Sequence, residues 1–158
     1  MKLLLLSLFA ALLPSAAADA PLTKLNEAGY AKLIAAQKGH VLLVDFWATW
    51  CTPCRKEMPL VAKLAARLQA KGFRLVTISS DELENEPAAR AFLKDAGIAG
   101  ASYIKAAKDD DAFIRQIDPK WGGELPALVL YDRTGKKVKM WKGETAVADI
   151  EAAVVKLL

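Results

Sequence analysis

The chain has 158 residues, of which 54% are hydrophobic and 25% are charged, enough to bury one core in a single domain. Its 22 basic and 18 acidic residues leave a formal net charge of +4. A charge this mild argues for solubility and against a nucleic-acid-binding surface.

The first 18 residues have the pattern of a secretory signal peptide. Lys2 supplies a positive region, residues 3–13 an apolar region, and residues 16–18 a small-residue cleavage site. A retained membrane anchor is the alternative, but the apolar stretch is shorter than the roughly 20 residues of a membrane span, and Pro14 interrupts it. We therefore expect cleavage near Ala18, which would leave a periplasmic protein with one domain over residues 19–158.

Strands and helices are predicted to alternate along the rest of the chain. Helical spacing and end signals predict helices over residues 26–39, 60–72, 85–97, 110–118 and 147–158. Apolar runs of strand length predict strands over residues 41–47, 73–80, 101–106, 126–132 and 136–143, the last two joined as a hairpin by the turn DRTG. Because this alternation implies parallel pairing through crossovers, the sequence predicts an α/β fold with a mixed sheet flanked by helices.

Three details of these elements are specific enough to check against a structure. In the second predicted helix, an apolar stripe should contain Leu60, Val61, Leu64 and Leu68. Asn85 should cap the third helix. The lysines of KKVKMWK are typical of a solvent-facing or edge strand, where they protect against further pairing.

The stretch DFWATWCTPCRKEMP carries the candidate chemistry. Cys51 and Cys54 are the two cysteines of the chain, and they lie between a predicted buried strand and a helix. Their spacing places both sulfurs on one face of the first helical turn, near enough to bond, and Pro53 suits that turn. The positive end of the helix favours the thiolate of Cys51. Cys51 is therefore predicted to attack, and Cys54 to resolve the mixed disulfide.

Two other roles of such a cysteine pair are a structural disulfide and a metal site. A disulfide that staples a fold usually closes a long loop, whereas a bridge between Cys51 and Cys54 closes a very short one. A zinc site needs three or four ligands, and the one histidine, His40, stands at the far end of the strand from Cys51. We therefore predict no such metal site. A Cu(I) site with two thiolates is chemically possible, so a Cu(I)-binding metallochaperone stays as the alternative function.

Two carboxylates lie close to the cysteines in sequence. Asp45 stands inside a predicted buried strand, where burial should raise its pKa and let it accept a proton from Cys54 through a water. An ion pair with a neighbouring lysine is the alternative. Glu57 follows Cys54 on the same helix face and is either a second acid–base group or a solvated helix residue. Both are kept as candidate catalytic residues.

Prolines and a tryptophan complete the candidate site. Pro59 should kink the helix that begins near the cysteines. Pro126 begins a strand after paired glycines, where a cis Leu125–Pro126 bond is expected. Trp50, beside Cys51, is predicted to be contact surface for a client. Together with it, the candidate substrate-binding residues are Thr52, Pro53, Leu125 and Pro126.

The segments VDFWATWCTPCRKEMP and ELPALVLYDRTGKKV resemble the thioredoxin superfamily, and more closely the exported TlpA/ResA-like thiol–disulfide oxidoreductases. The resemblance implies a thioredoxin fold in which Pro126 is the cis-proline facing Cys51 and Cys54. It also implies an acid–base role for Glu57, as in the exported branch, and for Asp45, as in cytosolic thioredoxins. Residues 80–124 look like the central insertion of the TlpA-like branch, and a helix over residues 26–37 replaces that branch's extended lead-in.

The resemblance also implies a function. We expect an exported, monomeric protein disulfide reductase whose only redox group is the Cys51–Cys54 disulfide, with no added cofactor. A membrane electron donor of the DsbD type would recharge it, and its clients would be CxxC-containing apocytochromes, as in cytochrome c maturation, or copper-site thiols. Because the dipeptide between the cysteines holds no histidine to stabilise a thiolate, a reducing couple is favoured over a net oxidant.

Overall fold

Six strands form one mixed sheet in the computed structural model, which describes residues 21–158. The sheet order is β1-β4-β3-β2-β5-β6. The strands are β1 (Thr23–Leu25), β2 (Val41–Trp47), β3 (Phe73–Ser79), β4 (Ala101–Lys105), β5 (Ala127–Tyr131) and β6 (Lys137–Lys142). The pairs β1–β4, β4–β3 and β3–β2 are parallel, whereas β5 pairs antiparallel with both β2 and β6. The predicted mixed sheet is confirmed, and the lysine-rich strand lies at its edge.

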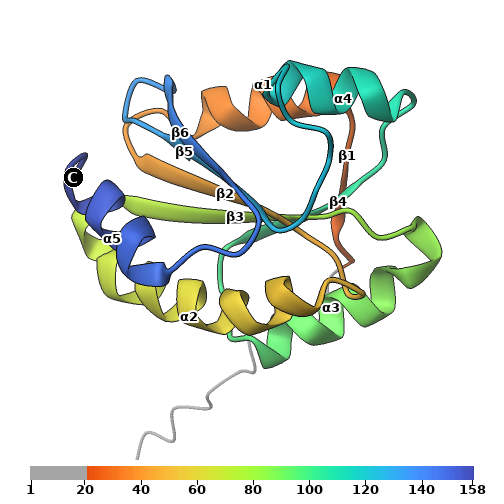
Figure 1. Cartoon of the computed structure of the whole chain (residues 1–158), viewed down its shortest axis with the longest axis horizontal. Helices are drawn as coiled ribbons and strands as arrows, with labels where there is room; N and C mark the ends of the chain where they lie inside the picture. Colours follow the sequence, from red (N-terminus) through yellow and green to blue (C-terminus); the bar gives the residue numbers. More distant parts are fainter. Residues whose placement is uncertain (1–20) are drawn as a thin grey trace, which may run out of the picture.

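Helices cover both faces of the sheet (Figure 1). One face carries α1 (Glu27–Ala36) and α4 (Asp110–Ile117), and the other carries α2 (Thr52–Leu68), α3 (Glu86–Asp95) and α5 (Val147–Val155). Two short 3-10 helices, η2 (Gln69–Lys71) and η3 (Leu83–Asn85), follow α2 and precede α3. All five predicted helices are therefore present.

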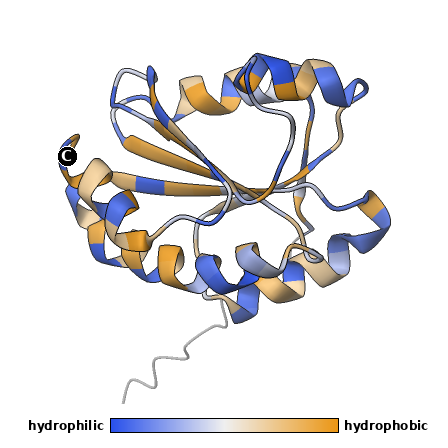
Figure 2. Cartoon of the chain, viewed as in Figure 1, coloured by the Kyte–Doolittle hydropathy of each residue, from blue (hydrophilic) through white to orange (hydrophobic). Residues whose placement is uncertain are grey.

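The central strand β2 explains where the candidate site lies. All seven of its residues are buried, because both faces of the strand are covered by helices, and Figure 2 shows the hydrophobic residues gathered on such central strands. Leu42, Val44 and Phe46 pack in one core cluster with residues of α1 and α4. Val41 and Leu43 pack in another with residues of α2 and α5. Since side chains alternate along a strand, Asp45 is directed toward the α2 side.

Two sequence predictions about the helices are wrong in detail. Leu60 is 50% exposed and does not belong to the buried stripe, which runs instead through Met58, Val61, Leu64 and Leu68. A one-residue step turns a helix by about 100°, so Leu60 points away from the face that Val61 buries. Asn85 occupies the N-cap position of α3, as predicted, but its side chain makes no capping hydrogen bond, because η3 runs directly into the helix.

The amino-terminal part of the described chain also differs from expectation. A short strand, β1, pairs with β4 before α1 begins, so the helix does not replace an extended lead-in. The strand has three residues, of which only Leu25 is buried, too few to produce a readable alternation. Between β3 and β5 the chain forms η3, α3, β4 and α4. The match of this stretch to a TlpA-like insertion stays a prediction.

The predicted signal peptide lies outside the described residues. Within residues 21–158, no helix is both long enough and apolar enough to cross a bilayer.

Candidate active site

The two cysteines meet at the start of α2. Cys51 occupies the N-cap position of the helix and Cys54 lies in its first turn, with Pro53 between them. Their sulfurs are joined in a disulfide, the Cα atoms are 5.3 Å apart, and the Sγ of Cys51 accepts a hydrogen bond from the backbone N–H of Cys54 at 3.3 Å. The expected placement of both sulfurs on one face of the first turn is confirmed. The free N–H groups of the helix end face Cys51, where they favour a thiolate.

The predicted contact residues lie at different depths around this disulfide. Trp50 is 68% exposed, Thr52 is exposed, and Pro53 and Leu125 are half-buried. Pro126 is buried, and the Leu125–Pro126 peptide bond is cis, as expected. Leu125 packs against the core cluster that contains both cysteines, so two segments far apart in sequence share one cluster.

A tilted pair of aromatic rings packs in the cluster that contains both cysteines. Trp47 is fully buried at the end of β2, and the centre of its ring lies 5.1 Å from the centre of the Phe92 ring on α3. The guanidinium of Arg55, next to Cys54 in sequence, lies 5.4 Å from the centre of the same Phe92 ring. The sequence reasoning missed Phe92, since nothing in its helical spacing distinguishes it from an ordinary core residue. Within residues 21–158 the indole N–H of Trp47 has no hydrogen-bond partner.

Asp45 is buried in β2, as predicted. Its side chain is 2% exposed. Burial raises the pKa of Asp45 well above its ordinary value, and the negative charge of Glu57 raises it further. Within the described chain no lysine forms an ion pair with this carboxyl, so the ion-pair interpretation is wrong.

Glu57 is buried rather than solvated, with 5% of its surface exposed. Its Oε2 atom accepts a hydrogen bond from the backbone N–H of Thr145 at 3.1 Å, in the loop between β6 and α5. Burial raises the pKa of Glu57; the Thr145 N–H opposes this shift, and the charge of Glu144 adds to it. Asp45 and Glu57 therefore form an electrostatically linked pair on the α2 side of the sheet.

Replacing Glu57 by glutamine should lower the apparent pKa of Cys51 in the reduced protein, because one nearby negative charge is removed. The amide oxygen still accepts from Thr145, so the free energy of unfolding should change by less than about 1 kcal/mol. Thiolate absorbance against pH and denaturant melts measure the two quantities. Asp149→Asn removes an exposed charge on α5 that does not act on Glu57, and it serves as the control. An unchanged or raised thiol pKa in Glu57→Gln would contradict the expectation.

Metal ligands do not gather elsewhere in the described chain. Residues 21–158 contain no group of three His, Cys, Asp or Glu side chains that could hold a metal ion. His40 lies just before β2, at the end of the strand away from Cys51. A Cu(I) site needs only the two sulfurs, and the titration described below addresses it.

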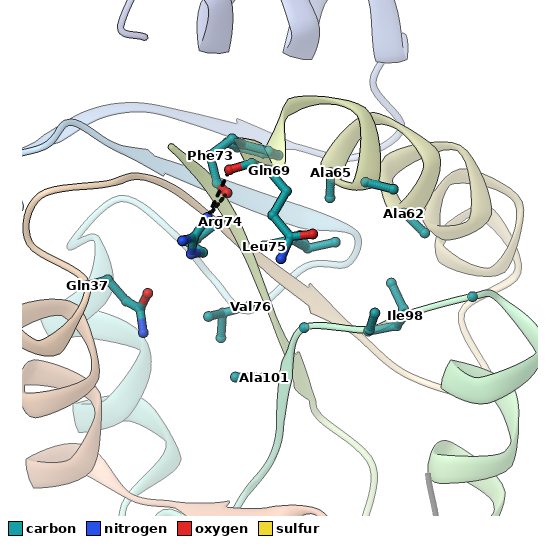
Figure 3. A pocket seen from close by; sticks show the side chains of 14 residues that line it. Gln37, Ala62, Ala65, Gln69, Phe73, Arg74, Leu75, Val76, Ile98 and Ala101 are labelled. Carbon is teal, nitrogen blue, oxygen red and sulfur yellow. Dashed lines mark hydrogen bonds between the residues drawn. The ribbon is translucent and has the colours of Figure 1, made fainter. Parts of the chain in front are cut away.

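A separate cavity of about 280 Å³ lies between α2, β3 and the segment over residues 97–101. Figure 3 shows its lining, which includes several alanines and the side chain of Arg74. The guanidinium of Arg74 donates to the backbone oxygens of Gln69 and Phe73 at 3.1 and 2.9 Å. Neither cysteine nor either buried carboxylate lines this cavity, so it is not part of the candidate site.

Comparison with known proteins shows the family to which this chain belongs. The Redoxin family model matches residues 12–154. The thiol–disulfide oxidoreductase ResA of Bacillus cereus is 31% identical over 120 residues, which are 76% of this chain and 65% of that protein. ResA of Bacillus anthracis is 30% identical with the same coverage. The chain thus spans about 65% of the length of these relatives.

A solved structure agrees with this relationship. The crystal structure of a thiol:disulfide interchange protein of the thioredoxin family, from Chlorobium tepidum, superposes with a TM-score of 0.66 at 26% identity. The match covers 78% of this chain and 83% of that chain. The predicted thioredoxin fold is confirmed.

Proposed function

The chain belongs to the Redoxin family, and from this premise we propose that it is a thiol–disulfide oxidoreductase that reduces disulfides in client proteins. The observation that carries the proposal is the Cys51–Cys54 disulfide at the start of α2. Leu125, which precedes the cis-proline Pro126, packs against the cluster that holds both cysteines. In its reduced dithiol form such a cysteine pair can pass two electrons to a client disulfide by thiol–disulfide exchange. The names of the Bacillus and Chlorobium relatives support the same activity.

The reaction proceeds by two exchanges. The thiolate of Cys51 attacks one sulfur of a client disulfide, forming a Cys51–client mixed disulfide and releasing one client thiolate, which takes a proton. Cys54, deprotonated, then attacks the Cys51 sulfur and releases the second client thiolate, which is protonated in turn. The client gains two electrons and two protons, and the protein ends as the Cys51–Cys54 disulfide.

The buried carboxylates handle the proton of the resolving cysteine. Asp45, whose pKa is raised by burial, accepts the proton of Cys54 through a water. Glu57 tunes this step through its charge on Asp45. Trp50, Thr52, Pro53, Leu125 and Pro126 form the surface that contacts the client.

The biological setting is part of the proposal. Residues 1–18 act as a signal peptide, and the domain over residues 19–158 works as a monomer in the periplasm without a further cofactor. A membrane donor of the DsbD type returns electrons to the oxidised pair. The clients carry CxxC sites, as in apocytochromes, or oxidised copper-site thiols. The signal-peptide pattern of the first 18 residues supports the export step.

The direction of electron flow is tested by the reduction potential. We expect a value nearer thioredoxin's roughly −270 mV than DsbA's roughly −120 mV, because no histidine between the cysteines stabilises the thiolate. Equilibration with glutathione or dithiothreitol buffers measures it, and an insulin-reduction assay with dithiothreitol tests turnover. A value near −120 mV would make the protein a net oxidant.

The Cu(I)-binding alternative uses the same sulfurs and is separated by a titration. Reduced protein is titrated with Cu(I) against a competing chelator, alongside the insulin assay. Weak copper binding with clear reductase activity is the expected result. Tight copper binding with no reductase activity would replace the oxidoreductase assignment with a metallochaperone.

A further inference from the structure

A buried aspartate outside the cysteine motif accepts hydrogen bonds from the loop that precedes Cys51. Asp81, which follows β3, is 2% exposed. Its carboxylate accepts from the backbone N–H of Thr49 at 2.9 and 3.2 Å and from the Thr49 hydroxyl at 2.6 Å. The hydroxyl of Ser79 donates to it at 2.7 Å. A buried carboxylate with this many donors is a strong, geometrically specific anchor.

The anchored loop is the one that presents Trp50. Thr49 immediately precedes Trp50, whose ring is 68% exposed beside Cys51. A large aromatic side chain exposed next to a nucleophile is typical of a contact surface for a partner. Asp81 thus fixes Thr49 to the end of β3. Because Thr49 immediately precedes Trp50, the position of Trp50 depends on this contact.

The cysteines themselves are held by other bonds. The N–H of Cys51 donates to the carbonyl of Ala48 at 3.1 Å, and the N–H of Arg55 donates to the carbonyl of Cys51 at 3.1 Å. The Sγ of Cys51 accepts from Cys54. None of these bonds uses Asp81, so the anchor acts on the loop before the helix more directly than on the helical turn that holds the sulfurs.

We infer that Asp81 is a positioning residue for client recognition: by fixing Thr49, it holds Trp50 where a polypeptide client docks. This inference rests on the proposed reductase function. It predicts a selective defect, because a polypeptide disulfide needs the Trp50 surface whereas a small aliphatic disulfide has little surface to place there.

The test compares two disulfides in single-turnover reactions of the reduced protein, insulin and hydroxyethyl disulfide. Asp81→Ala should lower the ratio of their second-order rate constants, insulin over small disulfide, about tenfold. Thr49→Val removes one hydroxyl donor and keeps the backbone N–H, so it should lower the ratio about threefold. Glu82→Gln, an exposed neighbouring charge, should leave both rate constants unchanged. Global destabilisation would lower both rates together and leave the ratio in place.

A double-mutant cycle shows whether Asp81 acts through Trp50. Trp50→Ala should lower the ratio about as much as Asp81→Ala, and the double variant should lower it no further. Independent, multiplying effects would overturn the inference. So would an unchanged ratio in Thr49→Val, which also decides the matter if Asp81→Ala does not fold.

A readout that needs no client separates this inference from the proposed function. Amide hydrogen exchange at Thr49 and the indole signal of Trp50 are followed by NMR in Asp81→Ala and Thr49→Val. Faster exchange together with a shifted Trp50 signal is expected. If the wild-type protein reduces neither disulfide, the proposed function fails. If the Trp50 signal does not respond to either variant, the positioning role fails whatever the activity.

Discussion

The Cys54→Ser protein should capture clients and fail to release them. Cys51 keeps its place at the start of α2, where the helix end favours its thiolate, so the first exchange still occurs. No second sulfur is then present to attack the mixed disulfide. Turnover should fall by roughly 1000-fold or more, as expected when one member of a catalytic unit is removed.

The trapped species can be identified directly. Non-reducing gels and mass spectrometry of Cys54→Ser, incubated with insulin or with a periplasmic extract, should show client-sized adducts that dithiothreitol removes. Cys51→Ser is the matched control and should trap none, because the N-cap position at the positive end of α2, which favours a thiolate, belongs to Cys51 and not to Cys54. Equal trapping by both variants would mean that the attacking and resolving roles are not divided as proposed.

Local patterns in the sequence were enough to predict most of the fold. The run VLLVDFW forms β2 with the predicted boundaries, because seven consecutive residues that fit a covered strand have no competing helical period. The CxPC spacing was also enough to predict the disulfide, because it places both sulfurs within one helical turn. The burial of Asp45 followed from its strand alone.

The errors arose where distant segments decide the outcome. Glu57 is buried because the loop at Thr145 closes over it and donates to it, and no pattern within α2 indicates that loop. Phe92 and Asp81 reach the site from α3 and from the end of β3. The short strand β1 forms because β4 offers it a partner. Each depends on tertiary contacts that no local window contains.

Asp45→Asn should stabilise the protein in a pH-dependent way. Burial raises the pKa of Asp45 above its unfolded value of about 3.9, so the folded state holds the proton more tightly. Below about pH 4 the carboxyl is neutral in both states and its burial is tolerated. As the pH rises toward the folded pKa, only the unfolded state releases the proton, and wild type loses stability by up to about 1.4 kcal/mol per pH unit.

The asparagine variant does not lose stability in this way. Its free energy of unfolding should therefore exceed that of wild type by an amount that grows from near zero at pH 4 to a plateau above the folded pKa of Asp45. At that plateau the difference should be about 1.4 kcal/mol for each pH unit by which folding raises the pKa of Asp45. Denaturant melts of the oxidised proteins from pH 4 to pH 8 measure the difference. Asp95→Asn, an exposed position on α3, is the control and should show no such trend.

The same substitution should slow the second exchange, because Cys54 loses its proton acceptor. General-base catalysis typically contributes about 100-fold or more, so release of a preformed mixed disulfide at pH 7 should slow by about that factor while its formation changes less. Adding Glu57→Gln to Asp45→Asn should then have little further effect on release, since Glu57 acts on this step through Asp45. Unchanged release in a stabilised Asp45→Asn protein would show that its carboxyl plays no part in the proton transfer, and the acceptor would have to be Glu57 or solvent.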